Sequence, residues 1–197
     1  SYINLGISCL IPFLYTPIML GMLGQAEYGL YSLSNSVIGY LSLLSFGFGG
    51  TIIRYISKAR ALGKKREVET AFGFFLLLYL GLAVLVLLGG WVLSNHVTEI
   101  FQKGLTAAEQ DKVCTLIRIM TFNTALSFPI SVFSSIIVSY ERYVFRKIVD
   151  MLSTIAGPIA NLIALYLGFA SVGMAVASTC VQILMLPLSV IYCKRTL

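Results

Sequence analysis

Residues 71–93 read "AFGFFLLLYLGLAVLVLLGGWVL", and this stretch decides the fold class. It contains no charged residue and almost nothing polar. A helix needs about 20 predominantly apolar residues to span the hydrocarbon core of a bilayer, whereas the strands of a membrane barrel are shorter and alternate in hydropathy. The stretch therefore predicts a transmembrane helix with a lipid-facing surface.

Five other apolar runs of comparable length accompany this one. In lipid a chain must satisfy its backbone hydrogen bonds internally, so the runs predict an all-α fold, a polytopic membrane helix bundle. We expect residues 1–197 to form a single transmembrane lobe, and we interpret the chain, which begins with Ser rather than Met, as a fragment of a longer chain. The six expected spans are roughly 2–23, 30–53, 71–94, 114–139, 148–168 and 172–193.

The composition argues against a soluble domain. The chain is 58% hydrophobic and 11% charged, whereas soluble domains average about 25% charged residues. Its net charge is +6, but the basic residues are confined to short gaps rather than spread over a folded face, so nucleic acid is not expected as a partner. The four cysteines form no CxxC pair and no zinc-ligand spacing, so we expect no metal site.

The basic residues are distributed unevenly among the gaps between the runs. Residues 54–69 contain six Lys or Arg, residues 141–147 contain three and the tail contains two, whereas the alternate gaps contain two in all. Because cytoplasmic loops carry an excess of Lys and Arg, both ends are predicted to be cytoplasmic. We interpret the basic run 54–66 as an anchor to the anionic leaflet, with contact to a phosphorylated ligand as the alternative.

Polar residues recur within three of the expected spans. Those in the fourth run recur every four residues, which makes an inclined stripe because each step drifts about 40° around a helix. Helix packing through small residues explains any one of them; taken together, they also fit the lining of a hydrated cavity. The three groups are Asn4, Ser8 and Thr16; Ser32, Asn35, Ser36, Gly39 and Ser42; and Asn123, Ser127, Ser131, Ser135 and Ser139.

Three ionisable residues lie within or beside the spans, namely Arg54, Arg118 and Asp150. Each either extends its charged group toward the headgroups or faces the interior of the bundle. No catalytic set is visible, because the single histidine, His96, lies in a predicted outer loop. The segment GFGGT lacks the ending of a phosphate-binding loop, so we expect neither an enzyme nor a cofactor.

Two segments resemble a known family. Residues 16–63, "TPIMLGMLGQAEYGLYSLSNSVIGYLSLLSFGFGGTIIRYISKARALG", and residues 123–152, "NTALSFPISVFSSIIVSYERYVFRKIVDML", resemble bacterial polysaccharide and O-antigen flippases. These flippases share a superfamily with multidrug and toxin extruders and with the peptidoglycan lipid flippase. The matching positions are Leu23, Gly24, Glu27, Tyr28 and Gly29; Gly47, Gly49, Arg54 and Tyr55; and Glu141, Arg142 and Tyr143.

The resemblance implies a transporter of two lobes that face each other across a cavity, of which this chain supplies the amino-terminal lobe. It implies alternating-access transport of an isoprenoid-diphosphate-linked oligosaccharide from the inner to the outer leaflet of the bacterial cytoplasmic membrane, for cell-surface polysaccharide biosynthesis. The implied partners are this lipid-linked oligosaccharide and membrane lipids, with glycan polymerase or ligase machinery as a further candidate.

On this basis we assign candidate substrate contacts. Hydroxyl and amide groups suit sugar hydroxyls, and an arginine fork suits phosphate. Three alternatives stay open: a multidrug antiporter of the same superfamily, a membrane-embedded glycan ligase or polymerase, and a structural membrane partner. The candidate lining residues are Asn4, Ser8, Asn35, Asn123 and Ser127, and the candidate diphosphate or electrostatic contacts are Arg54 and Arg118.

Overall fold

The computed structural model describes residues 2–45, 48–101 and 104–196. Within these residues the chain is entirely helical and contains no β-strand, which confirms the predicted fold class. The elements are α1 (Tyr2–Ser42), the 3₁₀ helix η1 (Leu43–Ser45), α2 (Phe48–Ala61), α3 (Lys65–Asn95), α4 (Val97–Ile100), α5 (Ala107–Ser139), α6 (Tyr143–Tyr166) and α7 (Ala170–Thr196).

Four of the described helices are long and apolar enough to cross a membrane: α3, α5, α6 and α7. They contain the expected runs 71–94, 114–139 and 172–193 completely, and the run 148–168 except for its last two residues. The chain is therefore a multi-pass membrane protein. Thr106 and Glu109 form a capping box at the first turn of α5.

The structure interrupts the helical course of the chain around the first two expected spans, 2–23 and 30–53. In α1 the backbone kinks at Gly24, whose φ of 76° lies in the left-handed region that favours glycine. The run 30–53 is divided between the end of α1, η1 and the start of α2. Beyond residue 53, α2 continues to Ala61 because its basic segment is amphipathic, with Ile52 and Ile56 buried and Arg54 exposed.

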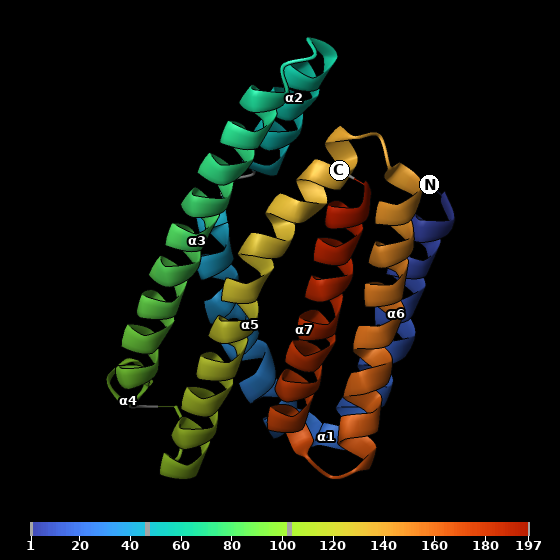
Figure 1. The fold of residues 1–197 in the computed structure, drawn as a ribbon. Helices are drawn as coiled ribbons and strands as arrows, with labels where there is room; N and C mark the ends of the chain where they lie inside the picture. Colours follow the sequence, from blue (N-terminus) through green and yellow to red (C-terminus); the bar gives the residue numbers. More distant parts are fainter. Residues whose placement is uncertain (1, 46–47, 102–103, 197) are drawn as a thin grey trace.

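The turns gather at the two ends of the bundle (Figure 1). Both termini lie at the same end as the α2–α3 and α5–α6 turns, and α4 lies at the opposite end with the α6–α7 turn and the kinked part of α1. The basic segments 54–69 and 141–147 therefore share one end. This follows from the two spans between them, α3 and α5, which cross the bundle in opposite directions. The cytoplasmic assignment of that end stays a prediction from the charge pattern.

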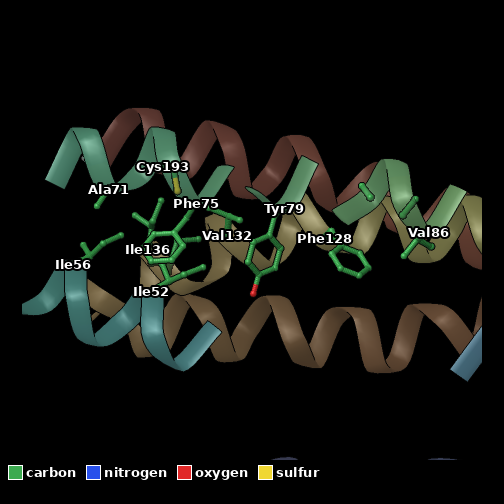
Figure 2. Close-up of a cluster of buried hydrophobic side chains, with 13 residues drawn as sticks. Ile52, Ile56, Ala71, Phe75, Tyr79, Val86, Phe128, Val132, Ile136 and Cys193 are labelled. Atoms are coloured by element: carbon green, nitrogen blue, oxygen red, sulfur yellow. The ribbon is translucent and has the colours of Figure 1, made fainter. Parts of the chain in front are cut away.

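The main core lies where α3 crosses α5, with α2 and α7 beside them (Figure 2). Tyr79 of α3 and Phe128 of α5 pack with their ring centroids 5.9 Å apart, and Ile52 and Ile56 of α2 close the cluster at one end. The apolar stretch of α3 thus has two faces. One face packs in this core, and the other face exposes large apolar residues such as Leu77. The lipid-facing surface that the sequence predicts is therefore only one side of this helix.

Candidate functional site

The half of α1 that follows Gly24 carries a polar surface that faces away from the bundle. On one side of this half-helix, Leu30, Ser34 and Ile38 are buried against the lobe. The opposite side is exposed and carries a group of small and polar residues, which we call the α1 polar face, beside the exposed ring of Tyr40. Its members are Ser32, Asn35, Ser36, Gly39 and Ser42.

This surface contrasts with the outward side of α3. Apart from Gly81, the exposed residues of α3 between 74 and 92 are large and apolar, among them Phe74, Leu85 and Trp91. Polar side chains in membrane bundles face a protein interior or a water-filled cavity rather than lipid. We therefore identify the α1 polar face as the candidate wall of an aqueous route, and α3 as lipid-facing.

The polar row of α5 winds around its helix, as its four-residue spacing predicts. At one end, Asn123 Nδ2 donates to Thr179 Oγ1 of α7 at 3.2 Å. Toward the other end, Ser135 approaches α2 so closely that a Cβ added at Gly49 would lie 3.4 Å from Ser135 Oγ. Between these contacts Ser131 is exposed. The ends of the row are therefore used in helix packing, and its middle is open.

The serines in the middle of this row are bonded to their own helix. Ser127 Oγ donates to the Thr124 carbonyl at 2.6 Å, and Ser131 Oγ donates to the Ser127 carbonyl at 2.9 Å. Such back-bonding satisfies the hydroxyl proton locally. Each hydroxyl oxygen keeps acceptor capacity, so these serines can accept hydrogen bonds from the hydroxyl groups of a sugar.

The predicted lining residues do not converge on a single pocket. Asn35 is exposed on the α1 polar face, whereas Asn123 and Ser127 are half-buried one turn apart on α5. Asn4 and Ser8 lie within α1, but their side chains fall outside the described part of the structure. The lobe thus presents separate polar patches.

The two candidate arginines lie toward opposite ends of the bundle. Arg54 is exposed on α2, beside the residues that pack on the start of α3. Arg118 Nε donates to Ser94 Oγ at 3.2 Å and its Nη2 donates to Asn95 Oδ1 at 3.3 Å, at the end of α3. The roughly 20 residues of α3 between these levels correspond to about 30 Å. One diphosphate cannot contact both arginines at once in this conformation.

A polar contact close to the kink of α1 joins three helices. Glu27 accepts from Lys112 Nζ of α5 at 2.9 Å and from Ser171 Oγ of α7 at 2.6 Å. Partial burial opposes ionisation of Glu27, but the Ser171 hydrogen bonds and the Lys112 charge outweigh it, so the pKa of this carboxyl lies below its ordinary value. Glu27 belongs to the sequence pattern of the family resemblance, and here it fastens α1 to α5 and α7.

Helix α7 contributes polar side chains that were not among the predicted site residues. Thr179 pairs with Asn123, and its neighbour Ser178 donates to Asn161 Oδ1 of α6 at 2.9 Å. The signal was available, because Ser178 and Thr179 are followed one turn later by Gln182 in an otherwise apolar run. Within the described residues, no group of His, Cys, Asp or Glu is placed to hold a metal ion.

Comparison with known proteins identifies the family. A family model described as polysaccharide biosynthesis protein matches residues 3–196. The chain belongs to this family. The resemblance to polysaccharide flippases seen in the sequence is thereby confirmed at the level of the family. No curated protein sequence matches the chain.

The fold of this polysaccharide biosynthesis family member is similar to that of a solved structure described as MATE in complex with MaD3S. The TM-score is 0.76 and the sequence identity 18%, over 99% of this chain and 45% of the other. The chain therefore spans less than half the length of that protein. The two share the architecture of one helical lobe, which confirms the predicted fold class.

Proposed function

We propose that the chain forms one lobe of a membrane transporter that flips an isoprenoid-diphosphate-linked oligosaccharide from the cytoplasmic to the outer leaflet. Membership of the polysaccharide biosynthesis family supports this proposal. Transfer of a sugar-diphosphate head across about 30 Å of hydrocarbon is prohibitive unless protein groups replace its hydration. The observation that carries the proposal is the α1 polar face, a hydroxyl- and amide-bearing surface on an apolar bundle.

The second lobe of the transporter would cover this face. The solved structure that shares this fold has more than twice the matched length, so a further bundle of similar size fits opposite the lobe. A polar face enclosed between two lobes meets substrate and water instead of lipid. Alternating access then amounts to a change in the angle between the lobes, which opens the enclosed face to one leaflet at a time.

Within this scheme the candidate residues act at different stages. Asn35 and Ser127 offer amide and hydroxyl groups to the oligosaccharide along the route, as would Asn4 and Ser8 near the start of α1. Because Arg54 and Arg118 are separated along the bundle, Arg54 meets the diphosphate at the cytoplasmic side and Arg118 meets it at the outer side. Arg118 would exchange its bonds to the end of α3 for bonds to phosphate.

Cysteine accessibility tests the proposed route in the full-length protein. The native cysteines are first replaced by alanine, and Asn35→Cys is compared with Leu85→Cys, an exposed position on lipid-facing α3. A membrane-impermeant methanethiosulfonate reacts with the thiolate, whose population is larger in water than in lipid. We expect labelling at Asn35 to be at least about tenfold faster, since each pKa unit gained by desolvation costs a factor of ten in thiolate. Equally slow labelling at both positions would exclude the α1 polar face from an aqueous route.

Export is measured in cells that lack the chromosomal gene and carry a plasmid copy. Asn35→Leu should abolish surface polysaccharide at normal protein abundance, whereas Leu85→Ile should leave it unchanged. Arg118→Ala should likewise reduce export. If both single variants, Asn35→Leu and Arg118→Ala, export polysaccharide at the wild-type level, neither residue takes part in the mechanism.

A multidrug antiporter is the second candidate, favoured by the fold shared with the MATE structure. Ion-coupled extrusion calls for a carboxylate within the membrane. The two acidic residues nearest the spans are engaged, Glu27 with Lys112 and Ser171, and Asp150 with Arg146 at 2.8 Å. Drug resistance conferred by the complementing plasmid, without any restoration of surface polysaccharide, would favour the antiporter.

A further inference from the structure

A pocket of about 820 Å³ lies at the end of the bundle that carries the basic segments. It is formed by the end of α2, the α2–α3 turn, the first turns of α3, and the ends of α5 and α7. This volume lies within the range of small-molecule sites. None of the predicted substrate contacts lines it, so the pocket is separate from the α1 polar face.

The lining of the pocket divides into an apolar floor and a charged rim. On the floor, Ile136 and Cys193 are buried, and Phe72 of α3 packs against Phe133 of α5 with ring centroids 5.8 Å apart. The rim is formed by four exposed charged residues, three of them cations, so its formal charge is +2. These rim residues are Arg60, Lys65, Glu69 and Lys194.

Arg60 is held in a fixed orientation at this rim. Its Nη1 donates to the Ser139 carbonyl at the end of α5 at 3.0 Å, and its guanidinium carbon lies 4.8 Å from the centroid of the Tyr140 ring. A guanidinium has five N–H donors, so the carbonyl leaves most of them available. A stacked and oriented arginine suits the planar, paired recognition of phosphate oxygens.

We propose that this pocket binds an anionic phospholipid of the leaflet at that end of the bundle. The headgroup phosphate lies between Arg60, Lys65 and Lys194, and an acyl chain covers the apolar floor. Basic pockets between transmembrane helices on the cytoplasmic side bind anionic headgroups in this way. A soluble phosphate would leave the floor in contact with water, so the combination of rim and floor favours a lipid. This proposal needs only the membrane location, not the transport function.

The test is lipid retention measured by native mass spectrometry of the purified full chain from mixed phosphatidylglycerol and phosphatidylcholine nanodiscs. We expect wild type to retain phosphatidylglycerol preferentially. Lys65→Gln with Lys194→Gln should lower that preference about 25-fold, because each lost cation costs about fivefold. Lys58→Gln with Lys147→Gln, two exposed cations at the same end outside the pocket, should change it less than about twofold. Equal losses in the two double variants would overturn the proposal.

A second variant tests the floor without any change of charge. Val190 is half-buried in the lining, and Val190→Phe should obstruct the acyl chain and reduce retention of phosphatidylglycerol at an unchanged helical circular dichroism spectrum. Unchanged retention in this variant would refute the acyl-chain assignment. Displacement of the bound lipid by millimolar inorganic phosphate would show a free-anion site, and displacement by equimolar isoprenyl diphosphate would show a substrate site. Either displacement overturns the assignment to a phospholipid.

Discussion

The substitution Gly90→Ala tests the central helix crossing of the lobe. A Cβ added at Gly90 of α3 would lie 2.1 Å from Thr121 Oγ1, 2.2 Å from Thr121 Cγ2 and 2.7 Å from Thr121 Cβ of α5. Rotation of the threonine moves its two γ atoms but not its Cβ. Ordinary contact begins at 3.4 Å, so the shortest of these distances falls short by 1.3 Å. The variant fits only if α3 and α5 move apart.

The expected magnitude follows from two opposing terms. Overpacking of a tight core costs about 1–3 kcal/mol, and replacing glycine by alanine in a helix gains about 1 kcal/mol. Gly81→Ala provides a matched control, because Gly81 is on the exposed side of the same helix and an added Cβ there meets no atom within 4 Å. Both variants share the helix-propensity gain. The difference between their free energies of unfolding, about 1–3 kcal/mol, therefore reports packing alone.

Thermal unfolding in detergent, followed by circular dichroism, measures this difference. For a chain of this size, 1 kcal/mol corresponds to about 2–4 °C in Tm, so Gly90→Ala should unfold about 2–12 °C below Gly81→Ala. Adding Thr121→Ala removes the two nearest atoms and should recover part of the loss. If Gly90→Ala unfolds at or above the temperature of Gly81→Ala, α3 and α5 do not cross as closely as the structure places them.

Three further predictions concern polar contacts between helices. Glu27→Gln should destabilise the lobe by about 1–2 kcal/mol, because it removes the charge that Lys112 and Ser171 contact, and thermal unfolding at pH 7 checks this. The pKa of Glu27 is lowered in the folded state. Its contribution to stability is therefore present above the ordinary glutamate pKa of about 4.3 and is lost as pH falls through the pKa of the folded state. If the difference in Tm between wild type and Glu27→Gln grows in acid, this prediction is wrong. A double-mutant cycle of Asn123→Ala and Thr179→Val should give a coupling energy of about 0.6 kcal/mol. The absence of a measurable coupling would show that Asn123 and Thr179 do not form the hydrogen bond seen in the structure.

Hydropathy was sufficient to predict four of the long helices. In lipid a long apolar run has few options other than a helix, so α3, α5, α6 and α7 follow directly from composition. The change from α1 to the 3₁₀ helix η1 at residues 43–45 did not follow, because a hydropathy run measures polarity and not helix propensity. The glycines at 47, 49 and 50 were the available signal, since each glycine weakens a helix by about 1 kcal/mol.

Periodicity predicted part of the candidate site. The drift of the α5 row is visible in the structure, where Asn123 contacts α7 and Ser135 approaches α2. The partners themselves could not be predicted, because they depend on which helix packs on which side of α5. For the same reason the sequence identified Arg118 as an unusual charge within a span, but not its bonds to the end of α3.

The serines of α1 bear on the two interpretations that the sequence left open, helix packing and the lining of a hydrated cavity. Ser34 and Ser36 both donate to the carbonyl four residues earlier, at 2.9 Å. Ser34 is fully buried against the lobe, as a packing residue should be, whereas Ser36 lies on the exposed side with Asn35. If all polar residues of this helix served packing within the lobe, they would share the buried side. Their division between two sides supports a second role for the exposed group, and we propose that this polar surface, which turns away from its own bundle, has water or another polar surface opposite it.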